Sequence, residues 1–386
     1  MTDPRLTPLA ARLPASVPFV GPETQERARG RPFLARLGAN ESGFGPSPRA
    51  CAAMQTAAGE AWMYGDPESH DLRAALAAHH GIGMENVLVG EGIDGLLGYL
   101  VRLFVGPGDP VVTSAGAYPT FGYHVTGFGG SLHTVPYRDD HEDLRALVTK
   151  AYDVGAKLVY LANPDNPMGT YHNAVDVGAT LDALPADTLL VLDEAYADFA
   201  PEEAIPPLDP TDRRLIRLRT FSKAHGLAGM RVGYALGHAD TISAFHKVRN
   251  HFGMSRLAQI GALASLEDTA HLSQTVARVA AARAEIGRVA AAQGLIALPS
   301  ATNFVAIDCG RDGAFARAVL NCLIARDVFV RMPGVPPLDR CIRVSAGPEG
   351  ALAHFTRALP EALADATAAA GAHTKKFPAR ETRPVA

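Results

Sequence analysis

The sequence predicts an α/β protein with a large, mostly parallel sheet and a second, smaller α/β domain. From His70 onward, short apolar runs alternate with stretches of helical period, and the links between them are brief. This alternation is typical of βα units, in which helices cover a parallel sheet. After Gly294 a second, shorter set of strands and helices begins, and the long Ala-rich stretch at 270–293 is suited to cross between the two domains.

We therefore expect four parts along the chain. Residues 1–45 form an N-terminal arm and part of the small domain, and residues 46–275 form the large domain. Residues 276–365 complete the small domain, and residues 366–386 are a loose tail. The arm is rich in proline and the tail in Ala, Lys, Arg and Pro, and chain ends of such composition are often poorly ordered unless they are docked.

The expected elements follow in chain order, each from its apolar period. In the first two parts the strands are 33–37, 86–90, 110–114, 131–137, 158–162, 189–192, 215–221 and 232–236, and the helices are 72–80, 93–104, 142–152, 173–184, 239–248, 256–266 and 270–293. In the small domain the strands are 303–309, 328–331 and 341–344, and the helices are 313–325 and 349–363.

Composition excludes several classes of function. The chain has 386 residues, 47% of them hydrophobic and 20% charged, with a formal net charge of −4. A slightly negative net charge does not favour binding to nucleic acid or to an anionic membrane. No apolar run is long enough for a membrane helix. The four cysteines and fourteen histidines show no metal-ligand spacing. We expect no metal, reduced thiols and a cytoplasmic protein.

The segment from Thr220 to Tyr234 is the main candidate for chemistry. It follows a run with strand character, and it is too rich in glycine to be a helix or a strand. A lysine here, Lys223, can condense with an aldehyde if its amine is kept partly neutral by burial or by nearby cations. Arg231, eight residues later, supplies a cation for an anion such as a phosphate.

Two upstream segments bring further polar groups to the same edge of the sheet. The turn Asn-Pro-Asp-Asn-Pro-Met-Gly, which contains Asn166, follows the strand at 158–162, and the strand at 189–192 runs into Asp193 and Tyr196. In open α/β sheets ligands bind beyond the carboxyl ends of the strands. We therefore expect Asn166, Asp193, Tyr196 and Lys223 to share one site.

The turn Gly-Glu-Gly-Ile-Asp-Gly at 90–95 lies between a strand and a helix and fits a dinucleotide-binding fingerprint. Such a site requires a carboxylate at the end of the next strand to hold the ribose. That strand ends in Ser-Ala-Gly at 114–116, which offers none. The turn is better suited to a single phosphate, which the free N–H groups of a helix N-terminus bind.

Asn-Pro-x-Asn-Pro-x-Gly, then Asp-Glu-Ala-Tyr, then Ser-Lys with an Arg eight residues later, occur here in this order. The arrangement resembles the fold type I pyridoxal-phosphate aminotransferases of class I and II, and among them most closely the histidinol-phosphate aminotransferases. The likeness extends from about residue 18 to about residue 359.

This resemblance implies a role for each candidate residue. Lys223 would carry pyridoxal 5′-phosphate, Asp193 would pair with the pyridine nitrogen, and Phe121 would stack on the ring. Tyr196 and Asn166 would bind the ring oxygen. The cofactor phosphate would be held by Gly92, Ile93, Ser222, Arg231 and, from the second subunit of a homodimer with shared active sites, Tyr64. The substrate would meet Arg343, Arg331, Phe19 and Asn40.

The reaction implied is amino transfer between an amino donor and a 2-oxo acid. Histidinol phosphate with 2-oxoglutarate is the first choice of substrates. Phe19 stands where the family usually has tyrosine, and His251 and Gly253 depart from the usual pocket segment. An aromatic amino acid therefore stays open as the donor. A pyridoxal-phosphate decarboxylase of a phosphorylated amino acid is a further alternative.

Overall fold

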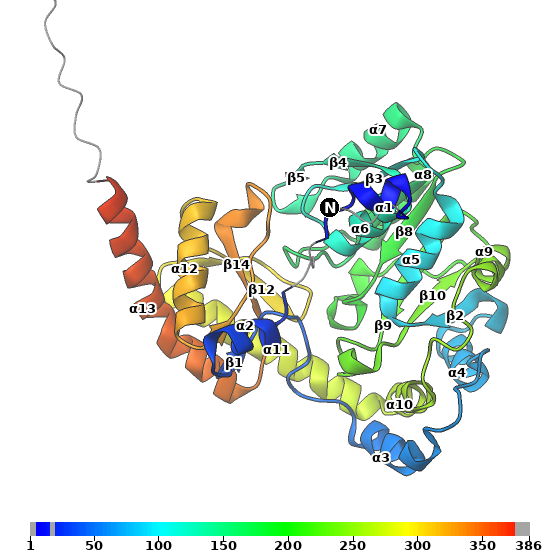
Figure 1. The fold of residues 1–386 in the computed structure, drawn as a ribbon, viewed down its shortest axis with the longest axis horizontal. Coiled ribbons are helices and arrows are strands. Elements are labelled where there is room, and N and C mark those ends of the chain that lie inside the picture. The colour runs from blue at the N-terminus through cyan, green and yellow to red at the C-terminus, as the bar shows by residue number, and fades with distance from the viewer. Residues whose placement is uncertain (1–4, 16–19, 375–386) are drawn as a thin grey trace, which may run out of the picture.

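A seven-stranded sheet forms the centre of the large domain (Figure 1). The computed structural model describes residues 5–15 and 20–374. The strand order is β2-β10-β9-β8-β7-β3-β4, and every neighbouring pair is parallel except the two that involve β10. The predicted, mostly parallel sheet is confirmed. Its strands are β2 (Val87–Gly90), β3 (Pro110–Ser114), β4 (Ser131–Val135), β7 (Leu158–Ala162), β8 (Leu189–Asp193), β9 (Leu215–Thr220) and β10 (Gly233–Gly237).

The central strands are buried on both faces, as continuous apolar runs in a covered sheet should be. In β7, Leu158 and Tyr160 pack under α5 (Gly92–Phe104) and α6 (Pro119–Gly127), whereas the alternate residues Val159 and Leu161 pack against α7 (Leu144–Val154) and α8 (Ala174–Ala183). The remaining helices of this domain are α3 (Pro48–Ala57), α4 (His70–His80), α9 (Ala239–Ala244) and α10 (Arg256–Leu266).

The long helix α11 (Thr269–Ala292) leads from the large domain into the small one (Figure 1). There, β11 (Ile296–Ala297), β12 (Phe304–Asp308) and β14 (Cys341–Ser345) form an antiparallel sheet. The predicted strand at 328–331 does not join it fully. Instead β13 (Val328–Phe329) pairs in parallel with β1 (Ala35–Arg36) from the N-terminal region.

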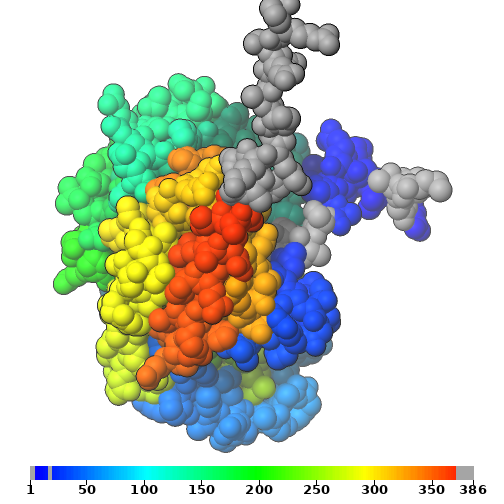
Figure 2. All heavy atoms as spheres, turned by 90° about the vertical axis from the view of Figure 1, so that its left-hand side faces the viewer, coloured from blue at the N-terminus to red at the C-terminus, as the bar shows by residue number. Residues whose placement is uncertain are grey.

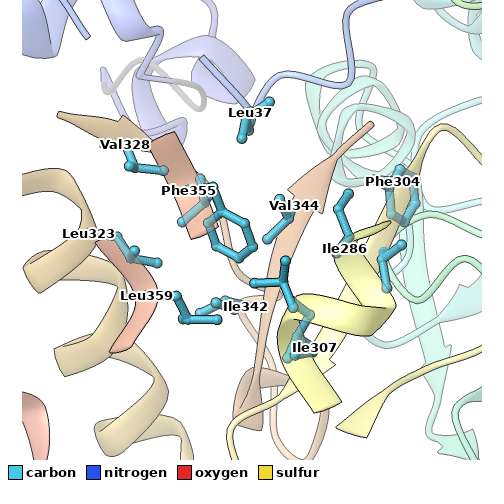
Figure 3. Packing of buried hydrophobic residues seen from close by; sticks show 14 of the residues in the cluster. Leu37, Ile286, Phe304, Ile307, Leu323, Val328, Ile342, Val344, Phe355 and Leu359 are labelled. Atoms are coloured by element: carbon cyan, nitrogen blue, oxygen red, sulfur yellow. The ribbon is translucent and has the colours of Figure 1, made fainter. Parts of the chain in front are cut away.

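The small-domain core gathers side chains from β1 to α13 (Glu349–Thr374) around the antiparallel sheet. Leu37, Ile342, Val344 and Phe355 face one another in its centre, and each is at most 1% exposed (Figure 3). On the outer face α13 lies between α11 and α12 (Gly313–Ala325) (Figure 2). The sequence led us to expect a loose tail from residue 366, but α13 continues to Thr374 because Ala366 is buried in this core.

The short elements mostly tie the two domains and the arm together. α1 (Pro8–Arg12) and α2 (Pro22–Arg29) belong to the arm, and Arg31 near the end of α2 pairs with Asp327 at 2.8 Å. The hairpin β5 (Tyr137–Arg138) and β6 (His141–Glu142) carries Asp140, which forms an ion pair with Arg340 of the small domain at 2.7 Å. Among the helices in the described ranges, none is long and apolar enough to cross a membrane.

Candidate active site

A cavity of about 520 Å³ opens at the carboxyl ends of β7, β8 and β9, between the large and the small domain. It is the place that the sequence predicted for the site, because loops that leave parallel strands at one edge converge there. Most of the predicted site residues line it, and they come from both domains: Asn40, Ile93, Asn166, Asp193, Tyr196, Ser222, Lys223, Arg231, Arg331 and Arg343.

Lys223 lies in the loop that follows β9, and its amine lies inside the cavity. The amine donates a hydrogen bond to the carbonyl oxygen of Asn40 at 3.1 Å. Burial and, secondly, the positive charge of Arg343 lower the pKa of Lys223 to about 8. A substantial fraction of the amine is therefore neutral near neutral pH, which is the condition for nucleophilic attack on an aldehyde.

Asp193 ends β8 and is 5% exposed. Its Oδ1 accepts a hydrogen bond from the Ala195 N–H at 2.9 Å, and its Oδ2 accepts one from the Tyr160 hydroxyl at 2.6 Å. Burial raises the pKa of Asp193 to about 6, against the opposing effects of these two bonds and of Lys223. A cationic group next to this buried carboxylate would stabilise its ionised form.

Asn40 links Lys223, Tyr196 and the small domain. Its side-chain amide donates to the Tyr196 hydroxyl at 2.9 Å, and its side-chain oxygen accepts from the Ser345 hydroxyl at 3.1 Å. Because the Tyr196 oxygen accepts this bond, its own proton stays available for a ligand in the cavity. Asn40 was predicted to contact the substrate. In the structure its side chain also orients the hydroxyl of Tyr196.

A cluster of donors lies at the N-terminus of α5. Gly92 has φ +75°, and a Cβ there would lie 2.6 Å from Nη2 of Arg231, so only glycine fits so close to the guanidinium. Arg231 also donates to the Ser222 hydroxyl at 3.5 Å. The free N–H groups at the start of this 13-residue helix, beginning at Gly92 and Ile93, complete a site suited to one phosphate.

A second group of cationic side chains lies at the small-domain wall, where Arg331 and Arg343 come from backbone positions that are paired by an isolated bridge. Arg343 donates to the Asn166 side-chain oxygen, and its buried Nε has no hydrogen-bond partner among the described residues. Burial lowers the pKa of both arginines. An unsatisfied buried guanidinium donor is costly, and an anion would satisfy it.

Phe121, which was predicted to stack on the cofactor ring, does not line the cavity. Phe121 is fully buried in α6 and stacks on Tyr160, with ring centroids 4.6 Å apart and planes inclined by 17°. The aromatic ring on this wall of the cavity belongs to Tyr118, three residues earlier in the same motif. The cause is helical geometry: α6 begins at Pro119, so Tyr118 stays in the loop at the cavity while Phe121 turns into the core.

Sequence reasoning also missed Tyr160, which lines the cavity from inside β7. A signal was present, because a tyrosine within an otherwise apolar, buried strand needs a partner for its hydroxyl. Of the predicted residues that the structure describes, Tyr64 also lies away from the cavity. Tyr64 is 76% exposed and packs against Phe252, with centroids 4.8 Å apart. Phe19 lies outside the described residues.

Within residues 5–15 and 20–374, no group of three or more His, Cys, Asp or Glu side chains is arranged to hold a metal ion. The four cysteines are all free. The groups that line the cavity include the Lys223 amine, the buried Asp193 carboxylate, several hydroxyl and amide groups, and three guanidinium groups.

Comparison with known proteins identifies this arrangement. The sequence model of the aminotransferases of class I and II matches residues 34–359. A histidinol-phosphate aminotransferase from Anaeromyxobacter sp. (strain Fw109-5) is 36% identical over 349 residues, which cover 89% of this chain and 95% of the relative. One from Roseiflexus castenholzii is also 36% identical, over 351 residues, with 89% and 94% covered.

Among solved structures, the crystal structure of histidinol-phosphate aminotransferase from Sinorhizobium meliloti in complex with pyridoxal-5′-phosphate is 53% identical to this chain. The match covers 94% of this chain and 98% of that one, with a TM-score of 0.92. With the family model matched over most of the chain, and the amine, the carboxylate and the donor clusters in one cavity, this protein belongs to the class I and II aminotransferases.

Proposed function

We propose that this chain is a homodimeric, pyridoxal-phosphate-dependent aminotransferase whose amino donor is histidinol phosphate and whose acceptor is a 2-oxo acid such as 2-oxoglutarate. The observation that carries the proposal is the meeting of Lys223 and Asp193 in one cavity, the first with a lowered and the second with a raised pKa. The names and titles of the relatives support the same substrate and cofactor.

The residues of the cavity fit pyridoxal phosphate at each end. Gly92, Ile93, Ser222 and Arg231 offer N–H, hydroxyl and guanidinium donors to its phosphate, and Asp193 offers a carboxylate to its ring nitrogen. Tyr118 offers an aromatic face for the ring. When bound, pyridoxal phosphate supplies an aldehyde that condenses with amines and a ring that accepts the electron pair from the substrate α-carbon.

The side chains of the cavity would transfer protons and hold the cofactor ring. Lys223, once its amine is free, removes and returns the proton of the substrate α-carbon, as a general base whose pKa lies near the working pH. Asp193 would keep a proton on the ring nitrogen of the bound cofactor. Tyr196 and the amide group of Asn166, which both line the cavity, would donate hydrogen bonds to the ring oxygen of the cofactor. These roles need no movement of the large sheet, since all four side chains already line the cavity.

Arg331 and Arg343 explain how one pocket accepts two unlike substrates. Histidinol phosphate carries a phosphate ester and no carboxylate, whereas a 2-oxo acid carries a carboxylate next to its carbonyl. Both ends are anions, and a pair of guanidinium groups can bind either through parallel N–H donors. The unpartnered Nε of Arg343 supports this role.

The test is an assay of the purified protein supplied with pyridoxal phosphate. We expect histidinol phosphate and 2-oxoglutarate to be converted, and a visible absorbance band from the cofactor that is lost in Lys223→Ala. Lys247→Ala, at an exposed lysine, is the matched control and should leave both signals intact. Conversion of phenylalanine in preference to histidinol phosphate would instead favour an aromatic donor, and release of carbon dioxide would favour a decarboxylase.

A further inference from the structure

Tyr160 places a phenol behind the carboxylate of the site. It lies in the middle of β7 at the wall of the cavity, is buried, and donates its hydroxyl proton to Oδ2 of Asp193 at 2.6 Å. A bond of this length between a hydroxyl and an ionised carboxylate is of the short, charge-assisted kind. It is the only hydrogen bond to Asp193 from another side chain among the described residues.

The geometry leaves Asp193 with little freedom. β7 and β8 are parallel neighbours, and their register sets Ala162 beside Asp193. Oδ1 is held by the Ala195 N–H and Oδ2 by Tyr160, so both ends of the carboxylate plane are fixed. Each carboxylate oxygen can accept a second bond. One lone pair of the carboxylate can therefore face the cavity in a defined direction.

Phe121 in turn fixes Tyr160. The two rings are nearly parallel, with centroids 4.6 Å apart, and both are buried. This arrangement is an offset stack of the kind that stabilises aromatic pairs. Phe121 thus belongs to the site indirectly, through Tyr160 and Asp193, although it does not line the cavity.

We propose that Tyr160 is a positioning residue for amino transfer, which holds the Asp193 carboxylate in the orientation and negative charge needed to keep the cofactor ring nitrogen protonated. The inference rests on the proposed function, since it needs Asp193 to face that nitrogen. Phe121 acts one step behind, by holding the ring of Tyr160 in place.

The electrostatic reason lies in the burial of Asp193. Burial favours its neutral form, and the Tyr160 bond is first among the interactions that oppose this. Without the phenol, the carboxylate becomes a stronger base and competes with the ring nitrogen for the proton they share. The other titratable groups that influence these two side chains are Glu142, Tyr118, Lys223 and Glu194, and the substitution of Tyr160 leaves all four in place.

Tyr160→Phe removes only the hydroxyl and keeps the ring stack, so it isolates the proposed bond. We expect kcat to fall by about ten- to a hundredfold, as for a lost bond to a charged group, while KM for histidinol phosphate changes by less than about threefold. The pH midpoint of the cofactor's visible absorbance should rise, because a less cationic ring holds the proton on the nearby Lys223 nitrogen more tightly.

Tyr137→Phe is the matched control. Tyr137 is a partly buried tyrosine whose phenol also donates to a buried carboxylate, that of Asp165, at 2.8 Å, but it does not line the cavity. We expect its absorbance midpoint to equal that of the unaltered protein. Phe121→Leu keeps the Tyr160 hydroxyl and weakens the stack, so it should shift the midpoint in the same direction as Tyr160→Phe and by less.

The unaltered protein is measured first. If it neither gains the visible band nor transfers an amino group, the proposed function fails, whatever the variants do. If it does both, an unchanged midpoint and kcat in Tyr160→Phe overturn the positioning role of Tyr160. Equal effects of Tyr160→Phe and Tyr137→Phe also overturn it, because they would indicate a general loss of core packing. Should Tyr160→Phe fail to fold, an unshifted midpoint in folded Phe121→Leu has the same consequence.

Discussion

Lys223 shows how a residue of ordinary type acquires unusual chemistry from its surroundings. A solvated lysine is almost fully protonated at neutral pH, with a pKa of about 10.4. Here burial removes the water that stabilises the ammonium form, and Arg343 adds a like charge. The carbonyl of Asn40 accepts a hydrogen bond from the amine and so fixes its direction without supplying a counter-charge.

This environment predicts the pH dependence of cofactor capture. Since the neutral amine is the nucleophile, the rate at which cofactor-free protein combines with pyridoxal phosphate should rise with pH through a midpoint near 8 and then level off. Stopped-flow absorbance measures this rate. In Arg343→Met the midpoint should move upward, because the like charge is gone. A midpoint at the value of an ordinary lysine in the unaltered protein would contradict the prediction.

The sequence predicted which residues belong to the site better than it predicted where their side chains point. Lys223, Asp193, Tyr196 and Asn166 could be found because each follows a strand of the parallel sheet, where the topology fixes the edge that they share. Phe121 was misplaced by the start of one helix, since a shift of a few residues at a helix N-terminus decides whether a ring enters the cavity or the core.

At the scale of elements, the turn into α5 depends on one glycine. Gly92 begins the helix with a left-handed backbone, and its missing side chain leaves room for the guanidinium of Arg231. The strand β10 approaches the same turn closely, because a Cβ on Gly233 would lie 2.8 Å from the backbone of Gly92. Two elements thus meet at a point where any side chain would separate them.

Gly92→Ala should therefore weaken binding of the cofactor phosphate. A methyl group at φ +75° is strained and would push Arg231 away, so we expect the dissociation constant of pyridoxal phosphate to rise by about tenfold or more. Equilibrium dialysis of the cofactor measures it. Gly178→Ala in α8, where an added Cβ meets nothing within 4 Å, is the control and should leave it unchanged. Equal affinity in both variants would disprove the role of Gly92.

The boundaries of most elements of the large domain could be predicted from apolar period, whereas the small domain was predicted less fully. Three of its strands were predicted near their observed positions, whereas β11 was missed, and the pairing of Val328–Phe329 with Ala35–Arg36 joins residues far apart in the chain. No local pattern specifies such a partner. The end of α13 was missed for a similar reason, because its last turns are stabilised by tertiary burial of Ala366, and its composition alone resembles a loose tail.

At the scale of the whole molecule, the cavity depends on the relative position of the two domains, because residues of both line it. The Asp140 carboxylate from the large domain and the Arg340 guanidinium from the small domain meet at 2.7 Å, and Arg340 also pairs with Asp308 of its own domain. The side chains of Asp140 and Arg340 are 21% and 24% exposed, so solvent screens the pair only partly. This contact resists separation of the two walls of the site.

A double-mutant cycle with Asp140→Asn and Arg340→Gln should give a coupling free energy of about 1 kcal/mol, toward the upper end of the range for partly exposed pairs. Asparagine suits the left-handed backbone of Asp140, where φ is +63°. Urea unfolding measures the coupling. The exposed pair of Glu285 and Arg288 within α11 is the control, with about 0.3 kcal/mol expected. If the coupling free energy is no larger than that of the control pair, the contact between Asp140 and Arg340 does not stabilise the arrangement of the two domains.

The surface around Tyr64 exposes several large aromatic side chains. Trp62, Tyr64 and Phe252 are 82%, 76% and 57% exposed, which is a large apolar area for a monomer to leave in water. Together with the family resemblance, this supports our proposal of a homodimer in which Tyr64 serves the active site of the other subunit.

Phe252→Glu should then favour the monomer, because it introduces a charge into the apolar contact between the subunits. Light scattering measures the molar mass in solution.

Hybrid dimers can decide which site Tyr64 serves. We expect Tyr64→Phe alone to bind pyridoxal phosphate more weakly by about tenfold, for the loss of one hydrogen bond to an anion, and Lys223→Ala alone to be inactive. When the two variants are unfolded together and refolded, each mixed dimer should contain one complete site, since the lysine of the first subunit receives the tyrosine of the second. Activity at limiting cofactor should then exceed that of either variant refolded alone. If Tyr64 served its own subunit, mixing would restore nothing, because every subunit would still lack one of the two groups.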